Sequence, residues 1–120
     1  MKIGICADIH GNSEAFRAVL DAFDSQRIDR IFCVGDVIGY GGSPVECIEL
    51  LQERHAEVVR GNHDDYAVRD EKHWRIHASA TEALRWTRSV LSTAHKDWLK
   101  SLPYQLTYRS FSFVHASHTR

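Results

Sequence analysis

Two side chains near the N-terminus have the types and spacing of metal ligands. Asp8 and His10 follow the apolar residues 3–7 and are separated by one residue. The continuous apolar run predicts a buried strand of a parallel sheet, and side chains alternate along a strand, so both groups would leave its end on the same side. A carboxylate oxygen and an imidazole nitrogen that converge can bind a hard or borderline divalent cation. The pair therefore predicts half of a metal site.

The other half is expected where later strands end. Strands are predicted over residues 28–34, 57–60 and 110–114, and they are followed by Asp36, by Asn62 with His63, and by His115. This oxygen and nitrogen set, with no thiolate, suits Mn, Fe, Zn or Ni. Taken alone, Asp36 fits a turn role equally well, because aspartate is a common turn residue. Four strand ends that each carry such a group favour one shared site.

Helices must connect these strands. One is predicted to begin at Asn12 or Ser13, either of which can cap its first turn, and to end near residue 27. The other is predicted over residues 43–54, where Ser43 and Glu46 form a capping-box pattern. Strand, helix, strand, helix, strand predicts parallel, right-handed crossover units. In such sheets ligands bind beyond the carboxyl ends of the strands, which is where the candidate ligands lie.

The second half of the chain has a different pattern. Residues about 65–102 predict a helical insert, in which Trp74 and Trp86 are expected to pack. Its two main helices are predicted over residues 79–91, with Val90 in the apolar stripe, and 93–101. Strands over residues 105–108 and 110–114 would form a hairpin that leads into His115. The chain is thus expected to be one α/β domain over residues 1–120.

Composition narrows the functional classes. The 120 residues are 43% hydrophobic with a net charge of -1, which is typical of one globular domain and gives no reason to expect nucleic acid or a membrane surface as partner. No apolar run is long enough to span a bilayer, and no export signal is evident. Cys6 and Cys33 lie in apolar runs and are expected to be small buried residues in a reducing compartment. A cytoplasmic location follows.

The ordered motifs resemble a known family. Asp8-Ile9-His10, Gly35-Asp36 and Gly61-Asn62-His63-Asp64 resemble the DxH, GD and GNHD motifs of the calcineurin-like metallophosphoesterases. Residues 35–41 and 114–117 are similar to the small bacterial phosphodiesterase branch of that superfamily. The resemblance covers residues 1–117 and implies the N-terminal part of an α/β/β/α sandwich.

The resemblance also implies a dinuclear centre. Asp8 and His10 would hold one divalent ion, Asp36 would bridge two, and Asn62 and His115 would hold the second. Manganese is the expected metal, with Fe, Zn and Ni as alternatives. Such a pair of ions clamps phosphoryl oxygens and activates a hydroxide that attacks in line. The implied activity is hydrolysis of a small phosphate monoester or diester.

Two further residues would act on the substrate. By resemblance, His63 would contact the phosphoryl group and protonate the leaving oxygen, and Asp64 would orient the His63 imidazole. An imidazole titrates near neutral pH, which suits it to the role of general acid.

One family motif is missing. The family pattern closes with GHxH, which gives a histidine to each metal, and the chain ends at Arg120 without it. His118 lies too close to His115 to replace that motif and is interpreted as a bystander. We expect the chain to be the N-terminal half of a longer protein or a truncated product. Its uncovered apolar face would favour self-association.

The remaining basic residues receive structural roles. Solvated or helix-end positions are expected for His55, His73, His77 and His95. Contact with substrate phosphate is open to Arg60, Arg69 and Arg75, but ordinary surface positions are the expectation for all three.

Two rival functions remain open at this point. One is a catalytically incomplete module that binds a metal or a phosphorylated ligand. The other is a doubly wound nucleotide-binding domain, which the lack of GxGxxG in the first turn disfavours.

Overall fold

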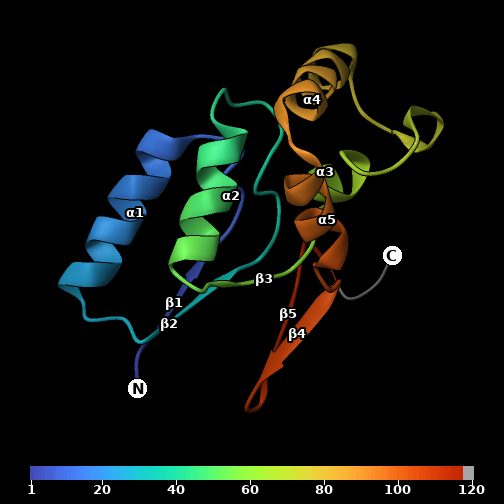
Figure 1. The fold of residues 1–120 in the computed structure, drawn as a ribbon. Coiled ribbons are helices and arrows are strands. Elements are labelled where there is room, and N and C mark those ends of the chain that lie inside the picture. Colours follow the sequence, from blue (N-terminus) through green and yellow to red (C-terminus); the bar gives the residue numbers. More distant parts are fainter. Residues whose placement is uncertain (118–120) are drawn as a thin grey trace.

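Three parallel strands form the central sheet of the computed structural model, which describes residues 1–117 (Figure 1). In the order β1-β2-β3 they are β1 (Ile3–Cys6), β2 (Arg30–Cys33) and β3 (Glu57–Val58). Cys6 lies opposite Cys33 in the register. The predicted parallel core is confirmed, although β2 and β3 are shorter than expected.

Two helices cover one face of this sheet. Helices α1 (Ser13–Ser25) and α2 (Pro44–Glu53) lie side by side in Figure 1, and each connects two neighbouring strands. Their apolar side chains meet alternate residues of β2, so that Ile31 and Cys33 belong to the helix-side core while Phe32 belongs to a cluster on the other face. This alternation is the expected pattern for a strand buried on both faces.

The caps of α1 and α2 differ. The Asn12 side chain accepts a hydrogen bond from the Ala15 amide at 3.0 Å, so the predicted cap of α1 is confirmed. Ser43 is the N-cap of α2, but its side chain makes no cap hydrogen bond. The predicted capping box is therefore wrong. The Glu46 carboxylate that would complete it is paired with the guanidinium of Arg17, on the neighbouring helix.

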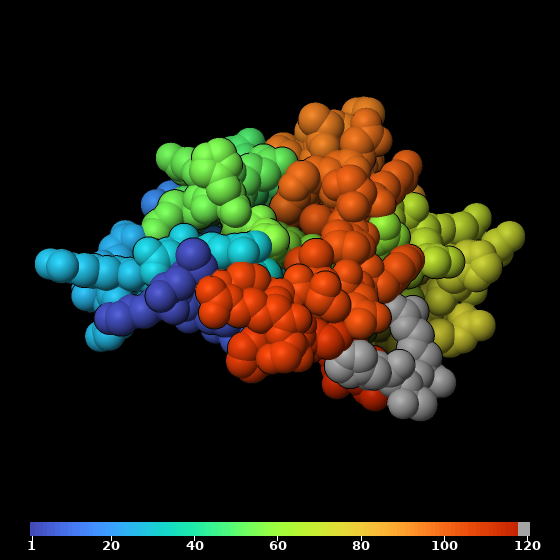
Figure 2. Space-filling model, turned by 90° about the horizontal axis from the view of Figure 1, so that it is seen from below, coloured from blue at the N-terminus to red at the C-terminus, as the bar shows by residue number. Residues whose placement is uncertain are grey.

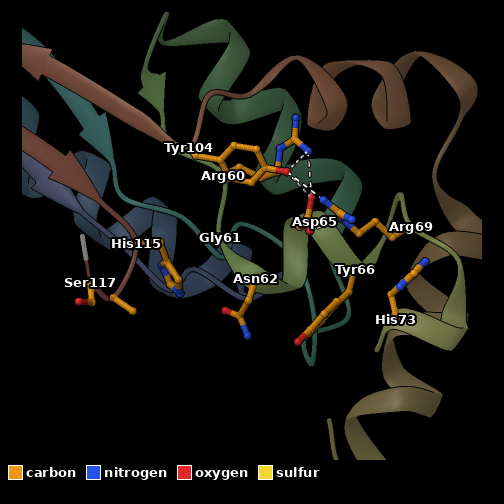
Figure 3. A pocket seen from close by; sticks show the side chains of 11 residues that line it. Arg60, Gly61, Asn62, Asp65, Tyr66, Arg69, His73, Tyr104, His115 and Ser117 are labelled. Carbon is orange, nitrogen blue, oxygen red and sulfur yellow. Dashed lines mark hydrogen bonds and ion pairs between the residues drawn. The ribbon is translucent and has the colours of Figure 1, made fainter. Parts of the chain in front are cut away.

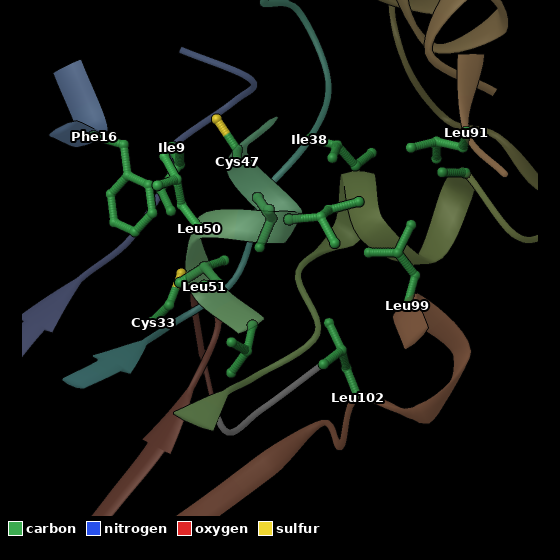
Figure 4. Packing of buried hydrophobic residues seen from close by; sticks show 14 of the residues in the cluster. Ile9, Phe16, Cys33, Ile38, Cys47, Leu50, Leu51, Leu91, Leu99 and Leu102 are labelled. Atoms are coloured by element: carbon green, nitrogen blue, oxygen red, sulfur yellow. The ribbon is translucent and has the colours of Figure 1, made fainter. Parts of the chain in front are cut away.

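The insert contains more helix than the sequence pattern indicated. Helix α4 (Ala78–Val90) and α5 (Thr93–Ser101) match the prediction closely, whereas α3 (Asn62–Tyr66) and a short 3-10 turn, η1 (Glu71–His73), were not predicted. Figure 4 shows one apolar cluster that extends from Phe16 and Leu51 to Leu99 and Leu102, so the insert shares its core with the α1–α2 side. Within residues 1–117, every helix is too short or too polar to cross a bilayer.

Some predicted contacts of the insert are corrected. Trp74 is buried and donates its indole N–H to the Tyr66 carbonyl at 2.8 Å, as expected of a packed side chain. Trp86 and Val90 are exposed instead, because they border an open hollow between α4 and the start of α2. His95 is not simply solvated: it completes a capping box with Ser92 at the start of α5.

A hairpin covers the opposite face of the sheet. Strands β4 (Gln105–Tyr108) and β5 (Phe111–Val114) pair antiparallel, and Phe113 stacks on Phe32 with ring centroids 4.8 Å apart. Figure 2 shows this hairpin, in orange-red, across the middle of the face between the blue N-terminal residues and the yellow part of the insert. Ile5 and Phe111 remain exposed. Self-association through such residues stays a prediction.

The cysteines are free thiols with structural surroundings. Cys33 and Cys47 are buried, and Cys6 is half-buried beside Cys33 in the register. Burial raises the pKa of the Cys47 thiol to about 12. Because a thiol with a high pKa is a poor nucleophile, the predicted packing role fits Cys47 as well as Cys33.

Candidate metal centre

Three of the predicted ligands converge at the carboxyl ends of β1 and β2. Ligand atoms of Asp8, His10 and Asp36 all lie within 4.8 Å of one another. Nε2 of His10 is 3.7 Å from Asp8 Oδ1 and 3.5 Å from Asp36 Oδ2. The Asp8 side chain is 59% exposed whereas that of Asp36 is 5% exposed. Asp36 is thus the buried centre of the group, and Asp8 lies at its rim.

Strand alternation does not bring Asp8 and His10 together. Strand β1 ends at Cys6, and Asp8 and His10 have left-handed backbones with φ of 56° and 48°. Their amides donate to the carbonyls of Gly35 and Asp36, each at 2.9 Å, so the two loops run alongside each other. The convergence is therefore made by paired loops, and the physical reason given from sequence was wrong even though the pair was right.

Backbone carbonyls orient the two site imidazoles. The Nδ1–H of His10 donates to the Ile38 carbonyl at 3.1 Å, and that of His115 to the Val34 carbonyl at 2.8 Å. Each donation fixes the tautomer and leaves the Nε2 lone pair available. Nε2 of His115 lies 3.4 Å from Asp36 Oδ2. Asp36 therefore faces a correctly oriented imidazole from each of two loops.

Asn62 completes the second half of the group. Its side-chain amide lies 3.1 Å from His115 Nε2 and 3.0 Å from Asp36 Oδ2. When the Asn62 amide oxygen points at His115 Nε2 and the Asp36 carboxylate, three acceptor groups converge without a donor. When the amide is turned by 180°, its nitrogen donates to His115 and Asp36 instead. A cation is what satisfies converging acceptors of this kind. The residues therefore fit divalent metal on both sides of Asp36.

His63 lies beside these ligands in a tight pocket. It is buried, and among the described residues nothing hydrogen-bonds to its Nδ1. A Cβ on Gly39, where φ is +95°, would lie 2.3 Å from that atom, so only glycine lets the loop approach the ring. Burial lowers the pKa of His63, the Asp36 charge opposes this, and the neighbouring His10 lowers the pKa further. The net effect is that the pKa of His63 is lowered from its ordinary value.

The expected role of Asp64 is corrected. The carboxylate is fully buried, and its hydrogen bonds come from backbone amides at 2.8–3.3 Å, those of Asp36, Val37, Ile38 and Gly61. None of its recorded bonds within residues 1–117 reaches the His63 ring. Burial raises the pKa of Asp64 to about 6, against the effect of the amide donors. Asp64 therefore holds the Asp36 loop in place, because that loop has no strand partner for its amides.

Tyr40 is a site residue that the sequence reasoning did not select. Its ring is exposed, with the centroid 5.1 Å from that of His10 and 4.9 Å from that of His63. Its φ of 66° is left-handed, like those of Asp8, His10 and Asp36. The signal in the sequence was a large aromatic residue between Gly39 and Gly41 in a loop that also carries a candidate ligand.

Two hollows flank the centre. The first, of about 630 Å³, contains Asn62 and His115 together with Arg60, Asp65 and Arg69, and we call it the Arg69 hollow (Figure 3). The second, of about 770 Å³, is lined by residues 8–12, Glu14 and residues 40–43, and we call it the Asp8 hollow. Both are large enough for a small-molecule ligand, and both reach the ligands around Asp36.

Comparison with known proteins agrees with this geometry. The profile of the calcineurin-like phosphoesterases matches residues 1–118. The chain belongs to that family. It is 38% identical over 101 residues to the uncharacterized protein MJ0912 of Methanocaldococcus jannaschii, a match that covers 84% of this chain and 42% of that protein. The recognised family and the mixed α/β fold are thus confirmed.

Solved structures give the same result. A metallophosphoesterase from Sphaerobacter thermophilus is similar with a TM-score of 0.78 and 35% identity, over 93% of this chain and 45% of that one. The hypothetical protein PH1004 from Pyrococcus horikoshii OT3 shares the fold with a TM-score of 0.79 at 22% identity, over 87% of this chain and 48% of that one. This chain spans less than half the length of these relatives. His118 lies outside the described residues.

Proposed function

We propose that this calcineurin-like domain serves a metal-dependent phosphoesterase that hydrolyses a small phosphate monoester or diester. The observation that carries the proposal is the position of Asp36. Its buried carboxylate has the Nε2 atoms of His10 and His115 at 3.5 Å and 3.4 Å, and both imidazoles are oriented by backbone carbonyls. A carboxylate between two such imidazoles can bridge two cations.

We assign the ligands to two ions from their neighbours: Asp8 lies near His10, and Asn62 lies near His115. Asp8 and His10 would hold one ion and Asn62 and His115 the other, with Asp36 shared. When bound, two divalent ions supply Lewis acidity to the phosphoryl oxygens and lower the pKa of water. Manganese is the metal we propose, because an oxygen and nitrogen set without thiolate suits it.

His63 is proposed as the group that meets the leaving oxygen. Its ring centroid lies 5.0 Å from that of His10, and its Nδ1 has no partner among the described residues. The backbone amide of His63 donates to Asp36 Oδ1 at 2.9 Å, which ties the His63 main chain to the Asp36 carboxylate. A proton can pass from this ring to an alkoxide that departs on its side of the centre.

A specific observation keeps the non-catalytic module as the second candidate. The Asp8 side chain is 59% exposed, so the ion between Asp8 and His10 would be held more openly than the one beside Asn62. A site with one firm position would bind a metal or a phosphate group without efficient turnover.

The two functions are separated by substitution of the bridging carboxylate. Asp36→Asn keeps the shape of the side chain but removes its charge, so we expect manganese-dependent hydrolysis of p-nitrophenyl phosphate and its bis ester to fall at least about 100-fold. The manganese content per chain, measured by elemental analysis after loading and desalting, should be two ions in the wild-type protein and fewer in the Asp36→Asn protein.

The matched control is Asp97→Asn, at an exposed position of α5, and it should change neither quantity. Wild-type turnover in the Asp36→Asn protein would refute the bridging role. Wild-type protein with one ion or none, and without turnover, would favour the binding module.

A further inference from the structure

The two hollows beside the metal centre have opposite charge. Two arginines face one carboxylate, that of Asp65, in the Arg69 hollow. The Asp8 hollow is lined by the carboxyl groups of Asp8 and Glu14 and by no lysine or arginine. A negatively charged part of a ligand is attracted to the first and repelled by the second.

The two arginines of the Arg69 hollow are not equivalent. The side chain of Arg60 is 13% exposed, and it donates to the Leu102 carbonyl at 3.1 Å and to Asp65 at 2.9 Å, so it ties the insert to β3. The side chain of Arg69 is 49% exposed and contacts the other oxygen of Asp65 through Nε. One carboxylate therefore fixes two guanidiniums, which leaves an excess positive charge and the exposed end of Arg69 in the hollow.

The hollow is continuous with the metal centre. Asn62 and His115 line it, and the Asn62 amide is also 3.0 Å from Asp36 Oδ2. Figure 3 shows His115 and Asn62 on one side of this space and Arg69 and His73 on the other. A ligand with one phosphoryl group at the centre can thus extend toward Arg69 without leaving the hollow.

We infer that the Arg69 hollow binds a second phosphoryl group of the substrate, next to the one that is cleaved. The guanidinium fork binds phosphate oxygens by charge-assisted hydrogen bonds. Nε of the half-exposed Arg69 contacts Asp65 and its Nη2 lies 3.4 Å from the Tyr104 hydroxyl, which leaves further N–H donors of the guanidinium for a phosphoryl group. This inference rests on the proposed function, because it names the substrate class of that site. The preferred substrates are compounds with two linked phosphoryl groups, and simple monoesters are poorer ones.

Methylenediphosphonate tests the inference, because it carries two linked phosphoryl groups and cannot be hydrolysed. It is titrated into the metal-free 120-residue protein and followed by amide NMR. We expect saturable binding, with the largest shifts at Asn62, Arg69 and His73 and none at Glu14. Arg69→Gln should raise the Kd about tenfold, which is the loss of a hydrogen bond to a charged group. Arg69→Lys keeps the charge without the guanidinium fork, so its Kd should lie between those of the wild-type and Arg69→Gln proteins.

The matched control is Arg75→Gln. Arg75 is an exposed arginine of the same insert. Among residues 1–117 its guanidinium donates to the carbonyls of Lys72 and Trp74, and its loss should leave the Kd within about twofold. The spectra themselves report whether each variant is folded. Absence of saturable binding, shifts centred on the Asp8 hollow, or an unchanged Kd in folded Arg69→Gln protein would overturn the inference.

A second assay separates this inference from the proposed function. Manganese-dependent turnover of p-nitrophenyl phosphate by the unsubstituted protein involves one phosphoryl group and does not require the second phosphoryl site. Turnover without a diphosphonate site contradicts the inference alone. A diphosphonate site without turnover contradicts the phosphoesterase function and leaves the anion site standing.

Discussion

The face of the sheet under α1 and α2 and the loops at the strand ends are stabilised in opposite ways. The first is apolar: Phe16, Ile48 and Leu51 are almost completely buried against the sheet. The second, which we call the ligand loops, comprises the loop residues 7–12 and 34–42 together with residues 61–64 at the start of α3. In these loops the buried side chains include the Asp64 carboxylate, which accepts hydrogen bonds from four backbone amides and which we call the Asp64 clamp. They also include the His63 imidazole, whose Nδ1 has no hydrogen-bond partner among the described residues.

The backbone shows the same contrast. Asp8, His10, Asp36 and Tyr40 all have left-handed φ values, whereas no residue inside α1 or α2 does. Each such residue costs on the order of 1 kcal/mol or more. The ligand loops therefore depend on the rest of the molecule for their conformation. The comparison shows that apolar packing stabilises the face under the helices, whereas the strained ligand loops depend on a few polar contacts for their conformation.

The largest effect is expected from removal of the Asp64 clamp. Asp64→Ala leaves buried amides of Asp36, Val37, Ile38 and Gly61 without an acceptor, and each unsatisfied donor costs about 1–3 kcal/mol. We expect a loss of about 4 kcal/mol or more in the free energy of unfolding, together with weaker manganese binding. Urea denaturation and metal analysis of the purified protein measure the two quantities.

Asp64→Asn is the control for the clamp. It keeps one acceptor oxygen and the volume of the side chain, so its loss of stability should be smaller than that of Asp64→Ala. Wild-type stability and wild-type metal content in the Asp64→Ala protein would contradict this contrast, because the ligand loops would then keep their conformation without Asp64.

A substitution on the apolar face should separate stability from metal binding. Leu51→Ala removes a completely buried side chain from the α2 side of the core, at a cost of about 3 kcal/mol in the free energy of unfolding. The folded protein should still bind manganese with wild-type affinity, since Leu51 lies in the apolar cluster and is none of the candidate ligands. Reduced affinity in the folded state would show that the two regions are coupled.

The smallest effect concerns the ion pairs of the insert. Burial alone would raise the pKa of Asp65, but hydrogen bonds from Arg60 and Tyr104 and the charge of Arg69 outweigh it, so the pKa is lowered in the folded state. A lowered folded pKa gives stability that is present above the unfolded value near 4 and is lost as the pH falls through the folded value.

Asp65→Asn should therefore cost about 1 kcal/mol at pH 6 and progressively less below pH 4. Urea midpoints of both proteins across that window measure the difference, in which the other titrating groups cancel. A difference that stays constant with pH would mean that the Asp65 charge is not what stabilises the insert.

Much of the fold was predictable because its signals are local. The helix start at Asn12 and the parallel strands follow from capping and apolar runs, and the structure confirms them. The capping box at Ser43 failed because Glu46 found a partner on another helix, Arg17. The exposure of Trp86 was missed because helical spacing does not say which side of α4 meets the core.

For the site, the sequence determined which groups are present, their order and the family to which they point. It did not determine how they are held. The left-handed backbones of Asp8 and Asp36, the contacts of Tyr40 with His10 and the clamp of Asp64 exist only because loops distant in sequence meet at one edge of the sheet. Residue types carry chemistry, but hydrogen bonds between distant loops set direction and distance, and these are decided by the tertiary structure.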